Sequence, residues 1–249
     1  IKGENMNPQI FGWQHLTFLA IFIVISAISL YFIKRYAKST KTQDIIVRCV
    51  GVLLFACILW NRISIAIRNG NALILIPDTF CGLSSLVLSL AVIFGKRNNN
   101  VLHFVLYVAF VGDLLTLCYP DFIEQNVSFF YNPTISGLLH HAVGLYLCIL
   151  LGLIGWFIPN YKKWPNLVIG FMAYITFGTF LIHVLNFGSA FYINSPILDG
   201  TPLTVWVIAP VFGVGYALYM GALELLRRRK KREKQVSFDQ IIKIIKSEP

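Results

Sequence analysis

The sequence predicts an all-α fold: a polytopic membrane protein with seven transmembrane helices, its N-terminus outside and its C-terminus in the cytoplasm. Seven long apolar stretches fill the chain, and 57% of its residues are hydrophobic. Charged residues make up only 13%, about half of their share in soluble proteins. The basic residues fall almost entirely in alternate gaps between the apolar stretches, and this alternation sets the orientation.

Each apolar stretch approaches the ~20 residues that a helix needs to cross a hydrocarbon layer of ~30 Å. A helix is the expected form because a backbone in lipid must satisfy its own hydrogen bonds. In chain order, we expect helices over residues 13–33, 46–67, 73–95, 101–119, 134–157, 166–187 and 203–226. The chain then divides into an external segment 1–12, a seven-helix domain 13–226 and a basic cytoplasmic tail 227–249.

The gaps between the expected helices differ sharply in charge. The gaps after the first, third and fifth stretches carry Lys34, Arg35, Lys38, Lys41, Lys96, Arg97, Lys162 and Lys163. The tail adds Arg227, Arg228, Arg229, Lys230, Lys231, Arg232 and Lys234. The remaining gaps contain Asp121, Glu124 and Asp199, with Arg68 as their basic residue. Because basic loops stay in the cytoplasm, we expect the first group of gaps to be cytoplasmic.

The net charge of +10 is therefore interpreted first as a topology signal. The tail suits anionic lipid head groups, and nucleic acid is not an expected partner, since the charge sits in short runs beside the membrane. The five cysteines all lie within expected helices, so we expect no structural disulfide, and no CxxC metal motif is present. We expect membrane lipids as partners, no metal and no organic cofactor. The sequence indicates no oligomeric state.

Polar side chains inside a membrane are costly, so each needs a reason. Here most of them gather toward the outer ends of the expected helices, within ~10–15 Å of the boundary at 1.5 Å per residue. Helix by helix, they are His15; Asn61 and Arg62; Asp78, Thr79 and Cys81; Asp113, Thr116 and Asp121; His140 and His141; and His183, Asn186 and Tyr192. We expect one shared polar cavity that opens outward.

Purely structural roles stay open for single members of this set. A lone histidine near a helix end, such as His15, is usually packed and hydrogen-bonded. Asp121 follows a proline and suits a turn, and Arg62 can extend to the membrane interface. Thr79 lies about 200° around a helix from Cys81, so we expect these two side chains to face different surfaces.

Short motifs spread along the chain resemble the YwaF family of bacterial integral membrane proteins. They are FGWQHLTFL at the first helix, LWN at 59–61, IPDTFCGL at 76–83, YPDF at 119–122, LLHHAVGLYL at 138–147 and NFGSAFYINSP at 186–196. That family is distantly similar to an animal multipass acyltransferase of ether lysophospholipids, and more remotely to androgen-induced hydrolases of fatty-acid esters. The resemblance implies a multipass protein of a bacterial plasma membrane.

The resemblance also implies site residues. The family's first-helix histidine matches His15, its Pro-x-His-x-Cys pattern matches Pro77 and Cys81, and its fifth-helix histidine matches His141. This chain has Thr79 where the family histidine usually stands, and Asp78 where the animal relative has its cysteine. The ester hydrolases are thought to use a threonine nucleophile with a histidine, which keeps Thr79 as an alternative to Cys81.

We therefore expect an acyl transferase or ester hydrolase that acts on lipid at the outer leaflet. Cys81, or Thr79, attacks a lipid ester carbonyl, and His141 takes the proton. Asp113 orients the imidazole of His141. Asn186 or Asn61 donates a hydrogen bond to the oxyanion, and Arg62 holds a lipid phosphate. Further candidates for substrate binding are His15, His140, Asp78, Asp121 and Tyr192.

Other classes of protein are open as well. A non-catalytic protein that binds lipid or assists envelope assembly needs the same cavity without a competent nucleophile and base. Seven helices alone suggest a receptor or photoreceptor, but the last one has no lysine for a retinal Schiff base. A haem protein is disfavoured because His103 and His183 are expected near opposite sides of the membrane.

Overall fold

The computed structural model describes residues 8–123, 128–198 and 200–247, with side chains as far as Arg227. Over these residues the chain is all-α, without strands. Its helices are α1 (Trp13–Tyr36), α2 (Thr40–Asn69), α3 (Phe80–Ile93), α4 (Leu102–Cys118), α5 (Asn132–Leu153), α6 (Trp164–His183) and α7 (Val205–Ser247). Three short 3-10 helices lie between these α-helices in the described residues: η1 (Ala72–Leu75), η2 (Asp121–Ile123) and η3 (Tyr161–Lys163). The predicted helical fold is confirmed.

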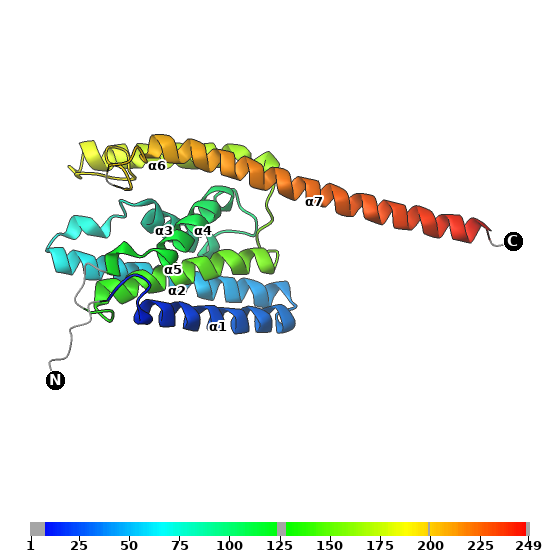
Figure 1. The fold of residues 1–249 in the computed structure, drawn as a ribbon, viewed down its shortest axis with the longest axis horizontal. Helices are drawn as coiled ribbons and strands as arrows, with labels where there is room; N and C mark the ends of the chain where they lie inside the picture. The colour runs from blue at the N-terminus through cyan, green and yellow to red at the C-terminus, as the bar shows by residue number, and fades with distance from the viewer. Residues whose placement is uncertain (1–7, 124–127, 199, 248–249) are drawn as a thin grey trace.

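α1, α2 and α5 run lengthwise beside one another, α6 and α7 run lengthwise on the other side of the shorter, oblique α3 and α4, and α7 continues past the end of the bundle (Figure 1). α5 is the central helix: it packs on α1, α2, α3 and α4, and most of its residues are buried. α1 lies at the edge, where His15 is its one buried residue. The other side chains of α1 are largely apolar and half-buried or exposed, as expected for a helix that faces lipid.

Five helices, namely α1, α2, α5, α6 with the preceding η3, and α7 through Arg227, are long and apolar enough to cross a membrane. α3 and α4 have 14 and 17 residues, which is short of the ~20 needed to span the hydrocarbon layer. The continuous helix expected over 73–95 is therefore wrong. Pro77 has no backbone N–H and Thr79 caps the next helix, so the chain makes η1, breaks, and restarts at Phe80.

The gaps after α1, α3 and α5 meet at one end of the bundle, here called the basic end. Asp44 joins them by accepting hydrogen bonds from Arg97 Nε at 2.8 Å and from Trp156 Nε1 at 2.7 Å. Lys163 Nζ donates to Asn100 Oδ1 at 2.9 Å. The basic gaps thus share one end, as their alternation requires. α7 itself continues through Ser247 without a break at residue 227.

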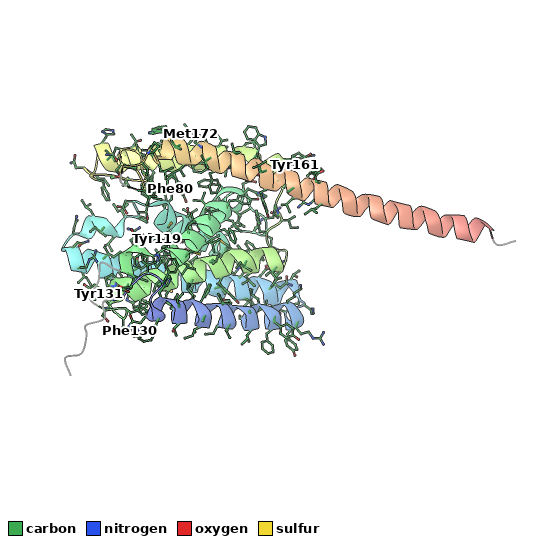
Figure 2. The ribbon with its side chains drawn as sticks, in the orientation of Figure 1. Phe80, Tyr119, Phe130, Tyr131, Tyr161 and Met172 are labelled. Carbon is green, nitrogen blue, oxygen red and sulfur yellow. The ribbon has the colours of Figure 1, made fainter. Side chains whose placement is uncertain are left out.

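Aromatic side chains mark both ends of the bundle (Figure 2). Phe130 and Tyr131 lie at the end opposite the basic end, and Tyr161 lies at the basic end. Tyr131 is 36% exposed and Tyr161 is 49% exposed. Amphipathic rings at both ends of an apolar bundle are typical of the two interfaces of a membrane.

Candidate functional site

A polar pocket of about 200 Å³ lies at the end opposite the basic end. α2 contributes its last turns, α3 its first turn and α5 its first half, while Phe122 of η2 also lines the pocket. The lining residues are Asn61, Arg62, Ile65, Arg68, Thr79, Cys81, Gly82, Phe122, Pro133, Gly137, His140 and His141. Of the twelve predicted site residues, six therefore line one cavity, and Asp78 and Asp113 contact its walls.

His141 and Asp113 form a buried pair behind this pocket. His141 Nδ1 lies 2.8 Å from Asp113 Oδ1, and the two residues are 5% and 0% exposed. Gly144, one turn further along α5, makes the approach possible, because a Cβ there would stand 2.2 Å from Asp113 Oδ2. When Nδ1 donates to the carboxylate, Nε2 is the nitrogen that can accept a proton. This is the geometry of a general base held by a carboxylate.

Cys81 lines the pocket from the first turn of α3. Its thiol reaches toward α4, where Sγ lies 3.8 Å from Thr116 Oγ1. A Cβ on Gly112 would stand 2.8 Å from this sulfur, so the glycine provides the space that the thiol occupies. Gly112 directly precedes Asp113. The thiol and the His141–Asp113 pair therefore pack against the same turn of α4.

Thr79 lines the same pocket as Cys81, so the expectation that they face different surfaces is wrong. The 100° step per residue applies only inside a helix, and Thr79 is the N-cap of α3, with extended backbone. Its hydroxyl accepts hydrogen bonds from Gly82 N at 3.2 Å and from Arg62 Nη2 at 3.3 Å. These contacts give Thr79 a structural role at the start of α3.

Arg62 is 9% exposed and links α2 to the residues that precede α3. Its Nη1 lies 3.2 Å from Asp78 Oδ1, in an ion pair, and its Nη2 donates to Thr79. It packs on Gly82, where a Cβ would stand 2.1 Å from Nη2. A guanidinium has five N–H donors, so this anchored arginine keeps donors beyond these two contacts.

Asn61 and Asn186, the two predicted oxyanion donors, are differently placed. Asn61 Nδ2 donates to Pro133 O and to Ser136 Oγ, both at 3.2 Å, so its two N–H groups are used to join α2 to α5. Asn186 is exposed, with φ 56°, in the loop after α6, and it does not line the pocket. The structure brings neither amide into position as a free donor.

Three further predicted residues lie outside the pocket. His15 is fully buried and joins two segments: Phe11 N donates to Nδ1 at 3.1 Å, and Nε2 donates to Leu117 O at 2.9 Å. Tyr192 stacks on Phe80, with ring centroids 6.2 Å apart, in the loop that covers α3. Asp121 is exposed at the start of η2. Both ring nitrogens of His15 are satisfied, which explains its burial without a ligand.

His140 adds an unexpected feature beside His141. Asp113, His140 and His141 each offer one ligand atom, and these atoms all lie within 4.8 Å of one another. In the part of the chain that the structure describes, both nitrogens of His140 and Asp113 Oδ2 are buried without a hydrogen-bond partner. Unpaired buried polar groups are costly. These three residues could hold a metal ion, although the sequence led us to expect none.

A comparison with models of protein families finds one model that covers most of the chain. The model of the TMEM164 family matches residues 10–226. The chain belongs to the TMEM164 family. The match includes every residue of the polar pocket and all seven helices as far as α7 Leu226. With the apolar helices, membership in TMEM164 makes this a multipass membrane protein. No curated protein and no solved structure matches the chain.

Several residues of this TMEM164 site were not predicted from the sequence. Ser85 Oγ lies 3.5 Å from Asp113 Oδ1, and Phe122 stacks over His141 with ring centroids 6.5 Å apart. Gly82, Gly112 and Gly144 make room for Arg62, Cys81 and Asp113. The signal available in the sequence was the glycine spacing: Gly82 follows Cys81 directly, and Gly144 follows His141 by three residues.

Proposed function

We propose that this TMEM164 family member is a membrane-embedded acyl transferase or ester hydrolase that acts on a lipid ester at the outer leaflet. The observation that supports this proposal best is the buried His141–Asp113 pair at 2.8 Å, next to a pocket that also contains the thiol of Cys81. A nucleophile, a base and a carboxylate that orients the base make up the arrangement used for acyl transfer. The motifs resemble the YwaF family, which is distantly similar to a lipid acyltransferase and more remotely to fatty-ester hydrolases, and this resemblance supports the same class.

The reaction begins when Cys81 Sγ attacks the carbonyl carbon of the ester, while its proton passes to His141 Nε2. The C–O bond of the tetrahedral intermediate then breaks, and the leaving alcohol takes the proton from His141. A second alcohol, such as a lysophospholipid, or water attacks the thioester in the same way and restores the thiol. Arg62 is a cationic donor that lines the same pocket, and it suits either the oxyanion or a lipid phosphate.

Cys81 is the preferred nucleophile and Thr79 the alternative. The hydroxyl of Thr79 already accepts two hydrogen bonds as a helix cap, whereas Cys81 Sγ has a single side-chain hydrogen-bond partner among the described residues, Thr116 Oγ1 at 3.8 Å. Reaction at the thiol therefore breaks fewer structural hydrogen bonds than reaction at the hydroxyl. A thiol is also the better nucleophile of the two groups.

The test is turnover by the purified protein in vesicles, with phospholipids that carry a labelled acyl chain and with lysophospholipid or water as acceptor. We expect transfer or release of the label and a thioester on the peptide that contains Cys81, found by mass spectrometry after rapid acid quenching. No turnover with any phospholipid, lysophospholipid or lipoprotein donor would refute catalysis. Lipid that binds in the pocket without reacting would then favour a lipid-binding or envelope-assembly role.

A second candidate is hydrolysis assisted by a metal ion, and the unpaired Asp113 Oδ2 and His140 nitrogens favour it. Two histidines and one carboxylate are a known ligand set of catalytic zinc sites, which leave a position open for water. Metal content of the purified protein decides between the two mechanisms. Stoichiometric zinc that is lost in His140→Ala and retained in Cys81→Ala would support the metal route. Protein without metal that still turns over excludes it.

A further inference from the structure

A second cavity, of about 680 Å³, lies between α4, α5 and α7. It shares no lining residue with the polar pocket. Its walls are largely apolar, and they extend along α7 from Phe212 to Arg227, a length of ~22 Å at 1.5 Å per residue. Its volume is within the range of ~300–1,000 Å³ that is typical of ligand sites. One leaflet of a hydrocarbon layer is ~15 Å deep, so the cavity can take a whole acyl chain.

The charged end of this cavity lies at the basic end of the bundle. Arg227 Nη2 donates to Pro159 O at 2.9 Å, and both residues line the cavity. This contact ties α7 to the gap after α5 and directs a guanidinium to the cavity mouth. Arg227 also begins the basic run Arg227, Arg228, Arg229, Lys230, Lys231, Arg232 and Lys234. Positive charge at one end of an apolar cavity complements a ligand that has an apolar chain and an anionic head.

Two hydroxyl groups on the cavity wall lack partners. Tyr107 and Tyr216 pack edge to face, with ring centroids 5.1 Å apart, and both line the cavity. Among the residues that the structure describes, neither buried hydroxyl has a hydrogen-bond partner. Buried hydroxyl groups normally find one. An ester carbonyl of a lipid, which accepts hydrogen bonds, is a partner of the required kind.

We propose that this cavity binds an anionic phospholipid of the same leaflet as the basic end, with one acyl chain between α4 and α7, its phosphate at Arg227 and an ester carbonyl at Tyr107 or Tyr216. The site is independent of the acyl chemistry proposed for the polar pocket. Anionic lipids are the expected source, because they enrich the cytoplasmic leaflet and attract basic segments beside the membrane. The lipid would fill the space between α4 and α7 and so fix the position of α7.

The chain offers a well-matched test, because two glycines on the cavity wall face open space. A Cβ added at Gly152 or at Gly215 meets no atom within 4 Å. Gly215→Leu therefore introduces a side chain at the cavity wall whose Cβ meets no atom within 4 Å. Gly213→Leu is the control: it lies two residues away on α7, also faces open space and does not line the cavity. Both substitutions favour a helix, so neither weakens α7 through its backbone.

The experiment measures lipid retained by purified full-length protein, by native mass spectrometry after reconstitution with phosphatidylglycerol or phosphatidylcholine. We expect wild type and Gly213→Leu to retain phosphatidylglycerol, and Gly215→Leu to lose most of it. Arg227→Gln should reduce the preference for phosphatidylglycerol about tenfold, the value of one charged hydrogen bond. A phosphatidylglycerol with a photoreactive group near its chain end should label peptides of α4 or α7.

Three results would overturn the proposal. They are equal retention by Gly215→Leu and Gly213→Leu, equal binding of the two lipids by wild type, and photolabelling confined to the outer faces of the helices. A turnover assay on Gly215→Leu separates this site from the polar pocket. Normal acyl transfer with lost phosphatidylglycerol supports two independent sites. Failure of the wild type to turn over leaves the lipid measurement valid, since it does not depend on catalysis.

Discussion

The polar pocket and the apolar cavity both depend on glycines, but they use them in opposite ways. At the polar pocket and directly behind it, the space beside three glycines is already occupied: a Cβ would stand 2.1 Å from Arg62 at Gly82, 2.8 Å from Cys81 at Gly112 and 2.2 Å from Asp113 at Gly144. In the apolar cavity, Gly152 and Gly215 have no atom within 4 Å of an added Cβ. The first set of glycines makes room for buried polar side chains, and the second set borders open space.

The proposed reaction and the proposed lipid site make different demands on one helical bundle. Charged groups inside a membrane must be paired and hydrogen-bonded, which requires close helix approach and therefore small residues. An acyl chain requires volume without polar contact. α5 serves both regions: His141 lines the pocket, and Cys148, seven residues later, lines the cavity. The two regions are thus separated along a single helix by ~10 Å.

The largest expected contrast between the two regions is the side of the membrane that each one faces. In a cysteine-free background, Ser128→Cys, five residues before Pro133 of the polar pocket, should react with an impermeant maleimide on intact cells. Lys96→Cys, at the basic end, should react only after permeabilisation, because basic loops stay in the cytoplasm. Both positions are exposed in the structure. Labelling of both from the same side would contradict the orientation and the seven-span topology together.

His141→Ala tests the chemistry of the polar pocket and should abolish measurable turnover. General-base assistance is worth ~10²–10⁴ in rate, and a thiol without a base is a weak nucleophile at neutral pH. The measurement is transfer of labelled acyl chains in vesicles. His183→Ala is the matched control, because His183 is exposed on α6 and does not line the pocket. Unchanged melting of both variants by fluorescence-detected size exclusion shows that loss of activity is not loss of fold.

The two candidate nucleophiles should separate clearly. Cys81→Ala should be inactive, while Thr79→Ala should retain most activity and lose about 1 kcal/mol of stability, the value of a helix N-cap. Thr79→Ser should restore that stability because a serine hydroxyl caps equally well. The measurements are turnover and thermal unfolding of each variant. Full activity in both alanine variants would exclude covalent catalysis at residues 77–83.

The helices and the pairing of histidine with aspartate could be predicted from the sequence for a simple reason. Apolar length and charge alternation are properties of single segments, and they place most helix ends within a few residues. The exceptions are the start of α2, six residues earlier than expected, the start of α3, and the end of α7 at Ser247. We paired His141 with Asp113 because both were expected at the same depth in the membrane. Few other side chains at that depth could orient the imidazole. The structure places these two side chains 2.8 Å apart.

The direction in which a side chain points depends on helix rotation and on loop conformation, and it could not be predicted. Asp121, Asn186 and His15 lie at similar depth, yet η2 exposes the first, a residue with positive φ exposes the second, and contacts with Phe11 and Leu117 bury the third. Thr79 was placed on the wrong face because the helix begins one residue after it. The apolar cavity was not predicted at all, since its walls come from three helices whose separation no single segment specifies.

The last comparison takes one glycine of each region on the same helix. Gly144→Ala should lower turnover about 100-fold, because its Cβ would displace Asp113 Oδ2, and a shift of ~1 Å near the reacting groups can cost ~10² in rate. Gly152→Ala, eight residues later, should leave turnover unchanged, since its Cβ meets no atom within 4 Å. Both changes replace glycine by the best helix former, so their effects on the backbone are matched. Vesicle turnover and thermal unfolding of the two variants are the measurements. Equal activity in the two variants would mean that Asp113 does not position His141, and the carboxylate would then be free for the metal-assisted route.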